Sequence, residues 1–243
     1  MEIINKLDVE ALHQEVQETG AVIIKDLLRE EVAEAAHDCL QNRVPWEFHY
    51  RKPHKGDVGI IGPQELQGMS DRDIQKLVPK IVKLKDNDFT FAYCRYTIPT
   101  SIEKTPEELQ ILTQIYQYFN SPEYLKILGD ITGDHSGQEV SSWASCYDRH
   151  HHLSIHMDDD FGQGRIAAHV LGLTKDWKKE WGGNFAFCNA HGKPVDVVPP
   201  AFNQLVIFKV PRLHLVSQVK PYAQGSRYSL FGWYKHKKEY FTD

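Results

Sequence analysis

The chain has 243 residues, of which 41% are hydrophobic and 25% are charged, and its formal net charge is −5. A chain of this size and composition can fold as a globular domain without a disulfide or a structural metal. General nucleic-acid binding normally shows as a basic excess, so the acidic balance excludes it as an expected role.

The amino-terminal stretch "MEIINKLDVEALHQEV" is acidic and lacks the continuous apolar core of a signal peptide. No run of the chain approaches the roughly 18 apolar residues of a membrane span. The cysteines are scattered without a C-x-x-C pair, which favours reduced thiols over a disulfide framework or a zinc knuckle. We therefore expect a cytoplasmic protein with no membrane partner.

The first elements along the chain alternate between helix and strand. Residues 8–20 place Val9, Leu12 and Val16 at helical spacing and end at Gly20. Residues 21–28, "AVIIKDLL", predict a strand or buried segment, and residues 29–43 predict a second amphipathic helix. Residues 46–100 are rich in Gly, Pro and charge, and "FTFAYCRYTI" is the one strand that we expect there.

Two further helices are predicted before residue 139. The first carries a capping box from Thr105 to Glu108 with Pro106 at its first helical position. Its apolar stripe consists of Leu109, Leu112, Ile115 and Tyr116. Residues 121–133 have a similar start, Ser121 followed by Pro122, and end near Gly133.

From residue 139 the pattern changes to short β segments separated by Gly and Pro turns. In order they read "EVSSWASCY", "HLSIHMD", "RIAAHVLGL", "NFAFC", "PVDVV", "QLVIFKV", "LHLVSQV" and "RYSLFGWY". Eight strands at this spacing predict a jelly roll. We expect a mainly β protein with flanking helices (α+β) and one domain over residues 1–243, with a helix-rich part at 1–135 and the β core at 139–236.

His156 and Asp158 are two residues apart, so on a strand both side chains would project to one face. A third metal ligand would then come from a distant strand, and His214 is the best candidate. Two histidines and a carboxylate form the facial triad of non-haem Fe(II) oxygenases. The H-x-D motif alone favours an exposed acidic turn beside surface histidines over a metal site.

A larger order of motifs distinguishes these interpretations. H-x-D is followed by Arg165, by Trp-Gly-Gly, by Pro-x-x-x-x-Leu-x-x-Phe, by His214 and by Arg-x-Ser. Residues 140–235 thereby resemble the prolyl-4-hydroxylase-like branch of the 2-oxoglutarate/Fe(II)-dependent dioxygenases. The resemblance implies a double-stranded β-helix, Fe(II) held by His156, Asp158 and His214, and 2-oxoglutarate and O2 as cosubstrates.

The same resemblance implies a cation for the far carboxylate of 2-oxoglutarate. Arg227 matches that position, and a guanidinium holds a carboxylate bidentately, as a lysine cannot. Ser229 shares its strand face and would add a hydroxyl donor. Tyr147 matches a tyrosine of the cosubstrate pocket, with a core aromatic as the competing interpretation.

Three further residues are candidates for substrate contact. His169 fits a core histidine first and a substrate contact second. Tyr93 and Arg95 alternate onto one strand face, where they would reach a carboxylate-bearing substrate or border the core.

Two features depart from the family's pattern. Gly172 stands where relatives often carry a polar side chain that helps to hold 2-oxoglutarate, so the anchoring is expected to be rearranged or the pocket enlarged. His150, His151 and His152 occupy a turn that commonly holds glycine, and we expect them to be exposed or at the substrate rim rather than on iron. Asp159 and Asp160 are expected to be solvated.

The resemblance implies hydroxylation of an unactivated C–H bond, coupled to decarboxylation of 2-oxoglutarate to succinate. Relatives that halogenate usually have a small residue at the carboxylate position, so Asp158 favours hydroxylation. A small molecule such as an amino acid or its derivative is the expected substrate. The alternatives are a prolyl or other residue hydroxylase acting on a protein or peptide, and a cupin-like Zn or Mn hydrolase or isomerase.

Overall fold

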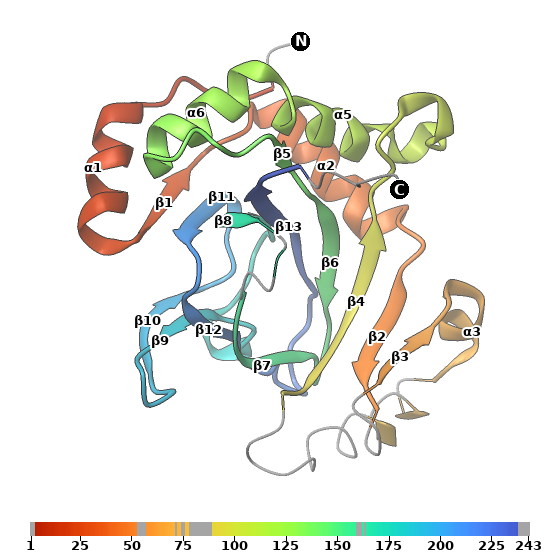
Figure 1. Cartoon of the computed structure of the whole chain (residues 1–243). Helices are drawn as coiled ribbons and strands as arrows, with labels where there is room; N and C mark the ends of the chain where they lie inside the picture. The colour runs from red at the N-terminus through yellow and green to blue at the C-terminus, as the bar shows by residue number, and fades with distance from the viewer. Residues whose placement is uncertain are drawn as a thin grey trace, which may run out of the picture.

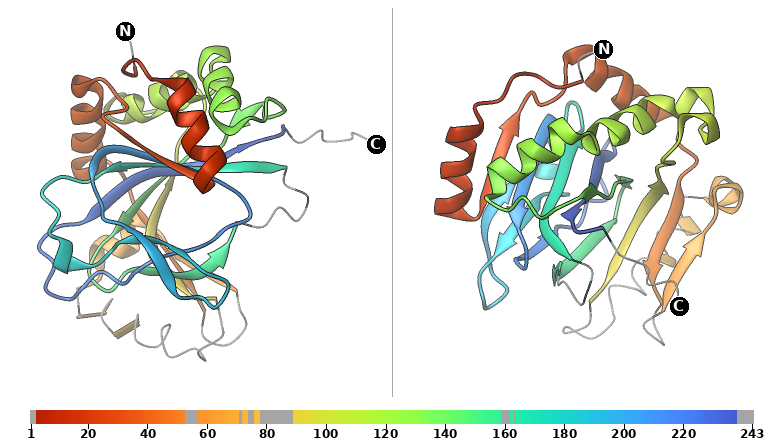
Figure 2. Two further views of the ribbon diagram at one scale, coloured as in Figure 1. Left: turned by 90° about the vertical axis from the view of Figure 1, so that its left-hand side faces the viewer. Right: turned by 45° about the horizontal axis from the view of Figure 1, so that its top comes forward.

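The computed structural model describes residues 3–52, 57–70, 72–73, 76–77, 89–158, 162 and 164–237. Asp159 and Asp160 lie outside these ranges. The described strands join one 13-stranded sheet that curls into a half-barrel, and helices α1, α2, α5 and α6 lie along one side of it (Figure 1, Figure 2). No helix in the described part of the chain is both long and apolar enough to cross a membrane.

The helices are α1 (Val9–Thr19), α2 (Glu30–Asn42), α3 (Pro63–Gly68), α5 (Gln110–Phe119) and α6 (Pro122–Thr132), with 3-10 turns η1 (Ile102–Lys104), η2 (Glu107–Leu109) and η3 (Lys179–Trp181). The strands are β1 (Ala21–Lys25), β2 (Glu47–Arg51), β3 (Val58–Ile61), β4 (Phe91–Thr97), β5 (Glu139–Val140), β6 (Trp143–Tyr147), β7 (His152–Met157), β8 (Arg165–Leu173), β9 (Phe185–Cys188), β10 (Pro194–Val198), β11 (Phe202–Lys209), β12 (Leu213–Val216) and β13 (Arg227–Lys235).

Local sequence signals explain where α1 and α6 begin and end. The Asp8 carboxylate accepts from the Ala11 backbone N–H, and the Ser121 hydroxyl accepts from that of Tyr124, so each helix has a side-chain N-cap. Gly20 and Gly133 end the two helices with φ of 75° and 76°, a left-handed conformation that glycine adopts without steric cost.

The helix after residue 105 begins later than its capping signal predicts. The Thr105 hydroxyl donates to the Ser101 carbonyl at 2.7 Å and contacts the Thr113 hydroxyl at 3.0 Å. The Thr105 hydroxyl therefore does not cap the helix, and the chain passes through η2 before α5 begins at Gln110. The predicted apolar stripe is nevertheless the buried face, since Leu109, Leu112 and Ile115 are buried.

The β segments predicted from residue 139 all form strands, with the first divided into β5 and β6. The continuous path through the sheet is β1-β11-β8-β13-β6-β4-β7-β12-β9-β10, and its neighbours pair antiparallel. Strand β4 stands between β6 and β7 on that path, and β2 and β3 extend the sheet from β4.

Two apolar clusters fill the two sides of the curled sheet. One packs α1, α2, α5 and α6 against outward-facing residues of β8, β11 and β13. The other lies inside the curl and includes Phe185, Phe187, Phe208 and Val216. The inner cluster forms part of the wall around the candidate active site.

Candidate active site

Strands β7 and β12 bring His156 and His214 together. The two residues are directly opposite each other in the antiparallel pair, and their ring centroids are 4.1 Å apart. Asp158 follows β7, with Oδ1 3.8 Å from His156 Nε2 and Oδ2 3.6 Å from His214 Nε2. One ligand atom from each of the three residues lies within 4.8 Å of the others.

Hydrogen bonds orient both imidazoles for metal ligation. His156 Nδ1 lies 2.9 Å from the Ser154 carbonyl, and His214 Nδ1 lies 2.8 Å from the Arg212 carbonyl. Because a carbonyl only accepts, each Nδ1 carries the proton and each Nε2 presents its lone pair. The three side chains therefore supply two neutral nitrogens and one carboxylate.

Burial keeps these histidines uncharged at neutral pH. Loss of hydration lowers the pKa of His156. Loss of hydration and the neighbouring His156 together lower the pKa of His214 to about 4. A facial set of two neutral imidazoles and a carboxylate beside an open cavity suits Fe(II), so the residues present fit the metal that the sequence predicts.

Arg227 and Tyr147 form a second polar wall next to the triad. They lie opposite each other on β13 and β6, and the Arg227 guanidinium carbon is 4.9 Å from the Tyr147 ring centroid. Arg227 is only 6% exposed, and no carboxylate of the described residues lies within ion-pair distance of it. A buried guanidinium of this kind is suited to an anionic ligand.

Ser229 and Tyr93 complete this wall. The Ser229 and Ser145 hydroxyls are 2.7 Å apart, and the Tyr93 ring stacks on Tyr147 with centroids at 5.0 Å and planes at 6°. Burial is the main cause of a raised pKa for Tyr147 and for Tyr93, so both phenols stay protonated and can donate hydrogen bonds.

One cavity of about 440 Å³ connects the metal triad with Arg227. Its remaining lining is mostly aromatic and aliphatic and includes Phe89, Tyr93, Phe231 and Trp233. The cavity thus combines a metal site, a buried cation and an apolar chamber, which is the composition expected of a small-molecule site.

Arg165 is a site residue whose placement the sequence does not predict. Its guanidinium carbon lies 3.7 Å from the Trp233 ring centroid, and Nη1 is 3.8 Å from Asp158 Oδ1. Strict alternation from Ala168, which lines the cavity, would turn Arg165 to the opposite face. The register shift between Tyr234 and Lys235 in the β8–β13 pair accompanies its turn into the cavity.

The substrate candidates are placed differently from one another. Tyr93 lines the cavity, whereas Arg95 is not in its lining and lies with its guanidinium carbon 4.5 Å from the Trp143 centroid. His169 is 1% exposed, and its Nε2 is 2.7 Å from the Tyr124 hydroxyl of α6. It faces the helical layer, so its geometry supports the core role over the substrate role.

Gly172 does not enlarge the cavity. A Cβ atom at this position would lie 2.7 Å from the Ala201 carbonyl oxygen, so backbone occupies the place where relatives carry a side chain. Glycine permits this close approach, and the polar side chains of the neighbouring cavity wall are those of Arg227, Tyr147 and Ser229.

The three consecutive histidines are expected to be exposed or at the substrate rim rather than on iron, and exposure is wrong for His151 and His152. His151 is 2% and His152 is 7% exposed, because β2 and the segment before β4 cover them. The His151 ring packs on Phe48 at 5.1 Å, and His152 Nε2 is 3.2 Å from the Thr90 hydroxyl. Among the described residues, the group able to hold a metal contains neither histidine.

Comparisons with known proteins agree with this geometry. Residues 142–235 match the family model of the 2OG-Fe(II) oxygenase superfamily. No curated protein sequence matches the chain.

Several solved structures share the fold. A Pseudomonas putida prolyl-4-hydroxylase superimposes with a TM-score of 0.57 at 15% identity, covering 94% of this chain and 99% of its own. A 2OG-Fe(II) oxygenase family oxidoreductase from Burkholderia pseudomallei gives 0.56 at 17% identity, covering 98% and 97%. A prolyl hydroxylase from Trichoplax adhaerens, in complex with a hypoxia inducible factor oxygen degradation domain peptide fragment, gives 0.56 at 13% identity, covering 93% and 88%.

Proposed function

Since residues 142–235 belong to the 2OG-Fe(II) oxygenase superfamily, we propose that this dioxygenase binds Fe(II) through His156, Asp158 and His214. The observation that carries the assignment is the convergence of two Nε2 lone pairs and a carboxylate at one end of a cavity whose other polar wall is Arg227. The metal, when bound with 2-oxoglutarate and O2, supplies the oxidising power for attack on a C–H bond.

Arg227 binds the far carboxylate of 2-oxoglutarate. It is buried, it lies on the cavity wall, and it is held against Tyr147, so its position is fixed before the ligand arrives. Tyr147 and Ser229 add hydroxyl donors on the same wall. These side chains orient the cosubstrate, and the surrounding aromatic residues exclude water.

The substrate that we propose is a small molecule with a carboxylate or another hydrogen-bond acceptor, such as an amino acid or its derivative. Two observations support this class. The Arg165 guanidinium faces the cavity, and the buried Trp233 Nε1 has no hydrogen-bond partner among the described residues. An acceptor on the substrate would satisfy that N–H group.

A peptidyl substrate is the second candidate. The Trichoplax adhaerens relative binds a peptide on the same fold, and the sheet beside the cavity continues through β4, β2 and β3 as a surface that a chain could follow. A zinc or manganese hydrolase or isomerase is not favoured, because the superfamily match and the buried Arg227 both indicate a dicarboxylate cosubstrate.

The metal assignment is tested by anaerobic addition of Fe(II) and 2-oxoglutarate to the protein. We expect a visible metal-to-ligand charge-transfer band in the wild type and in His191→Ala, whose histidine is exposed. The band should be absent in His214→Ala. A wild type without the band, or a His214→Ala variant with an unchanged band, would refute the assignment.

The substrate class is tested by succinate release. Purified enzyme is supplied with free amino acids, their derivatives and proline-containing peptides in parallel. Turnover stimulated by free amino acids and reduced by Arg165→Gln supports the small-molecule proposal, whereas stimulation by peptides alone rejects it.

A further inference from the structure

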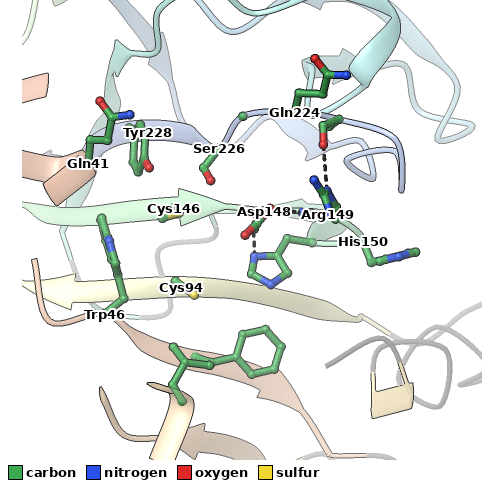
Figure 3. Close-up of a pocket in the computed structure, with 15 residues that line it drawn as sticks. Gln41, Trp46, Cys94, Cys146, Asp148, Arg149, His150, Gln224, Ser226 and Tyr228 are labelled. Atoms are coloured by element: carbon green, nitrogen blue, oxygen red, sulfur yellow. Dashed lines mark hydrogen bonds between the residues drawn. The ribbon is translucent and has the colours of Figure 1, made fainter. Parts of the chain in front are cut away.

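A second cavity, of about 460 Å³, lies on the opposite face of the strands that carry Arg227 and Tyr147 (Figure 3). We call it the rear cavity. Its floor is one row of residues across four neighbouring strands. Phe48 is in register with Cys94, Cys94 with Cys146, and Cys146 with Tyr228. Each of the last three floor residues has a chain neighbour on the other face of the sheet, and these neighbours, Tyr93, Tyr147 and Arg227, line the active-site cavity.

Aromatic rings form two sides of the rear cavity. Trp46 and Tyr228 are stacked with centroids 6.3 Å apart and planes at 23°, and Phe48 packs on the His151 ring at 5.1 Å. Both Trp46 and Tyr228 border the open space in Figure 3. The faces of such rings carry negative potential and attract cations.

The groups on the floor are uncharged. Burial raises the pKa of Cys94 to about 12 and that of Cys146 well above its ordinary value, so both thiols are protonated. Burial also lowers the pKa of His151 to about 3, which leaves its imidazole neutral. Asp148 supplies a carboxylate in the lining of the same cavity.

Two charged residues stand at the margin. The Asp148 carboxylate accepts a hydrogen bond from the Arg149 backbone N–H at 2.7 Å, and the Asp148 backbone N–H donates to His151 Nδ1 at 3.0 Å. The Arg149 side chain turns toward the loop before β13, where its Nε donates to the Ala223 carbonyl at 2.8 Å. Asp148 and Arg149 both line the rear cavity, Asp148 at an exposed position, and the Arg149 Nε is directed to the loop.

We propose that the rear cavity binds an organic cation, an ammonium or amidinium group on an apolar body, with Asp148 as its counter-ion and the rings of Trp46, Phe48 and Tyr228 as its walls. A carboxylate combined with several ring faces is the arrangement by which proteins select such cations. The site is separate from the iron centre and does not depend on the proposed function.

The test uses isothermal titration calorimetry of the 243-residue chain with benzamidine, and with benzamide and benzoate as neutral and anionic analogues of the same shape. We expect one benzamidine per chain and binding at least about tenfold weaker for both analogues. Saturating 2-oxoglutarate should not displace benzamidine, because the two cavities lie on opposite faces of the strands. Equal binding of the three compounds, or displacement by 2-oxoglutarate, would overturn the proposal.

A matched pair of variants locates the binding. Asp148→Asn should weaken benzamidine binding about tenfold and leave benzamide binding unchanged. Asp38→Asn, at an exposed position on α2 outside this cavity, should bind benzamidine as the wild type does. Unchanged binding in a folded Asp148→Asn protein would reject the site, and the comparison of analogues on the wild type decides the matter if that variant does not fold.

Discussion

At the scale of single residues, burial determines what the polar side chains of this protein can do. Arg227 and His169 are both almost fully buried, at 6% and 1% exposure. Arg227 faces a cavity that a ligand can enter, whereas His169 faces packed helices and is satisfied by Tyr124. The first side chain is therefore available for function and the second stabilises the fold.

Arg227→Lys should raise the KM for 2-oxoglutarate by about tenfold or more with little loss of Fe(II) binding. Lysine keeps the charge but cannot form the bidentate contact or lie flat on Tyr147. Steady-state succinate release measures the KM, and Arg43→Lys, at an exposed position, serves as the control. An unchanged KM would show that another group anchors the cosubstrate.

His169→Gln should make the protein less sensitive to acid. Burial lowers the pKa of His169 from 6.5 to about 3, so between these pH values the unfolded chain binds a proton that the folded chain does not. The contribution of neutral His169 to the free energy of unfolding is therefore fully present above pH 6.5. It is lost as the pH falls toward 3, by an amount on the order of a few kcal/mol.

The measurement for His169 is the urea midpoint between pH 7.5 and 5. The variant should lose less stability over this range than the wild type or His191→Gln does. The stability of the variant still depends on pH to some extent, because burial also lowers the pKa of His151 to about 3. Identical slopes in all three proteins would contradict the prediction.

At the scale of elements, short polar contacts fix how the amino-terminal part meets the β core. Asn203, at the start of β11, has a φ of 54° and is 4% exposed. Its Oδ1 accepts from the Leu28 N–H and its Nδ2 donates to the Leu28 carbonyl, both at 2.8 Å. This side chain joins the segment after β1 to the strand with which β1 pairs.

Asn203→Ala should destabilise the protein by about 2–4 kcal/mol, because it leaves the Leu28 N–H unpaired and adds strain at a positive φ. The Leu28 carbonyl keeps its hydrogen bond from Asn5 Nδ2. Asn203→Gly removes the same hydrogen bonds but tolerates the backbone angle, so it should cost less than the alanine variant. Urea unfolding of the two variants measures the difference. If the glycine variant is the less stable one, backbone strain is not part of the cost.

At the scale of the whole molecule, the sheet does not follow the order of the sequence. Strand β4, from the helix-rich half, pairs with both β6 and β7 of the metal-bearing half, and β1 pairs with β11. Residues 139–237 alone would therefore expose the edges of β6, β7 and β11.

We expect the fragment comprising residues 139–237 to lack a cooperative thermal transition. Loss of β1 and β4 removes hydrogen-bonding partners from three strands and uncovers the apolar face that α1, α2, α5 and α6 pack against. Circular dichroism during heating tests this against the full chain. A cooperative transition in the fragment would show that the β core folds by itself.

Some of this organisation follows from the sequence alone. The strands from residue 139 onward, the caps at Ser121 and Gly133, and the common face of His156 and Asp158 follow from alternation and capping, which depend on neighbouring residues. The choice of His214 rests on its place on a later strand with alternating apolar neighbours, and the order of motifs then distinguishes a metal site from an exposed turn.

Long-range contacts decided the rest. The burial of His151 under Phe48, the Ala201 carbonyl against Gly172 and the turn of Arg165 toward Trp233 each join segments that are far apart in the chain or depend on a register shift. Local periodicity in the sequence does not predict such contacts. Patterns among neighbouring residues were enough to predict the strands and the types of residue at the candidate metal site. Which polar side chains face the cavities depends on which strands become neighbours, and that emerged from the folded structure.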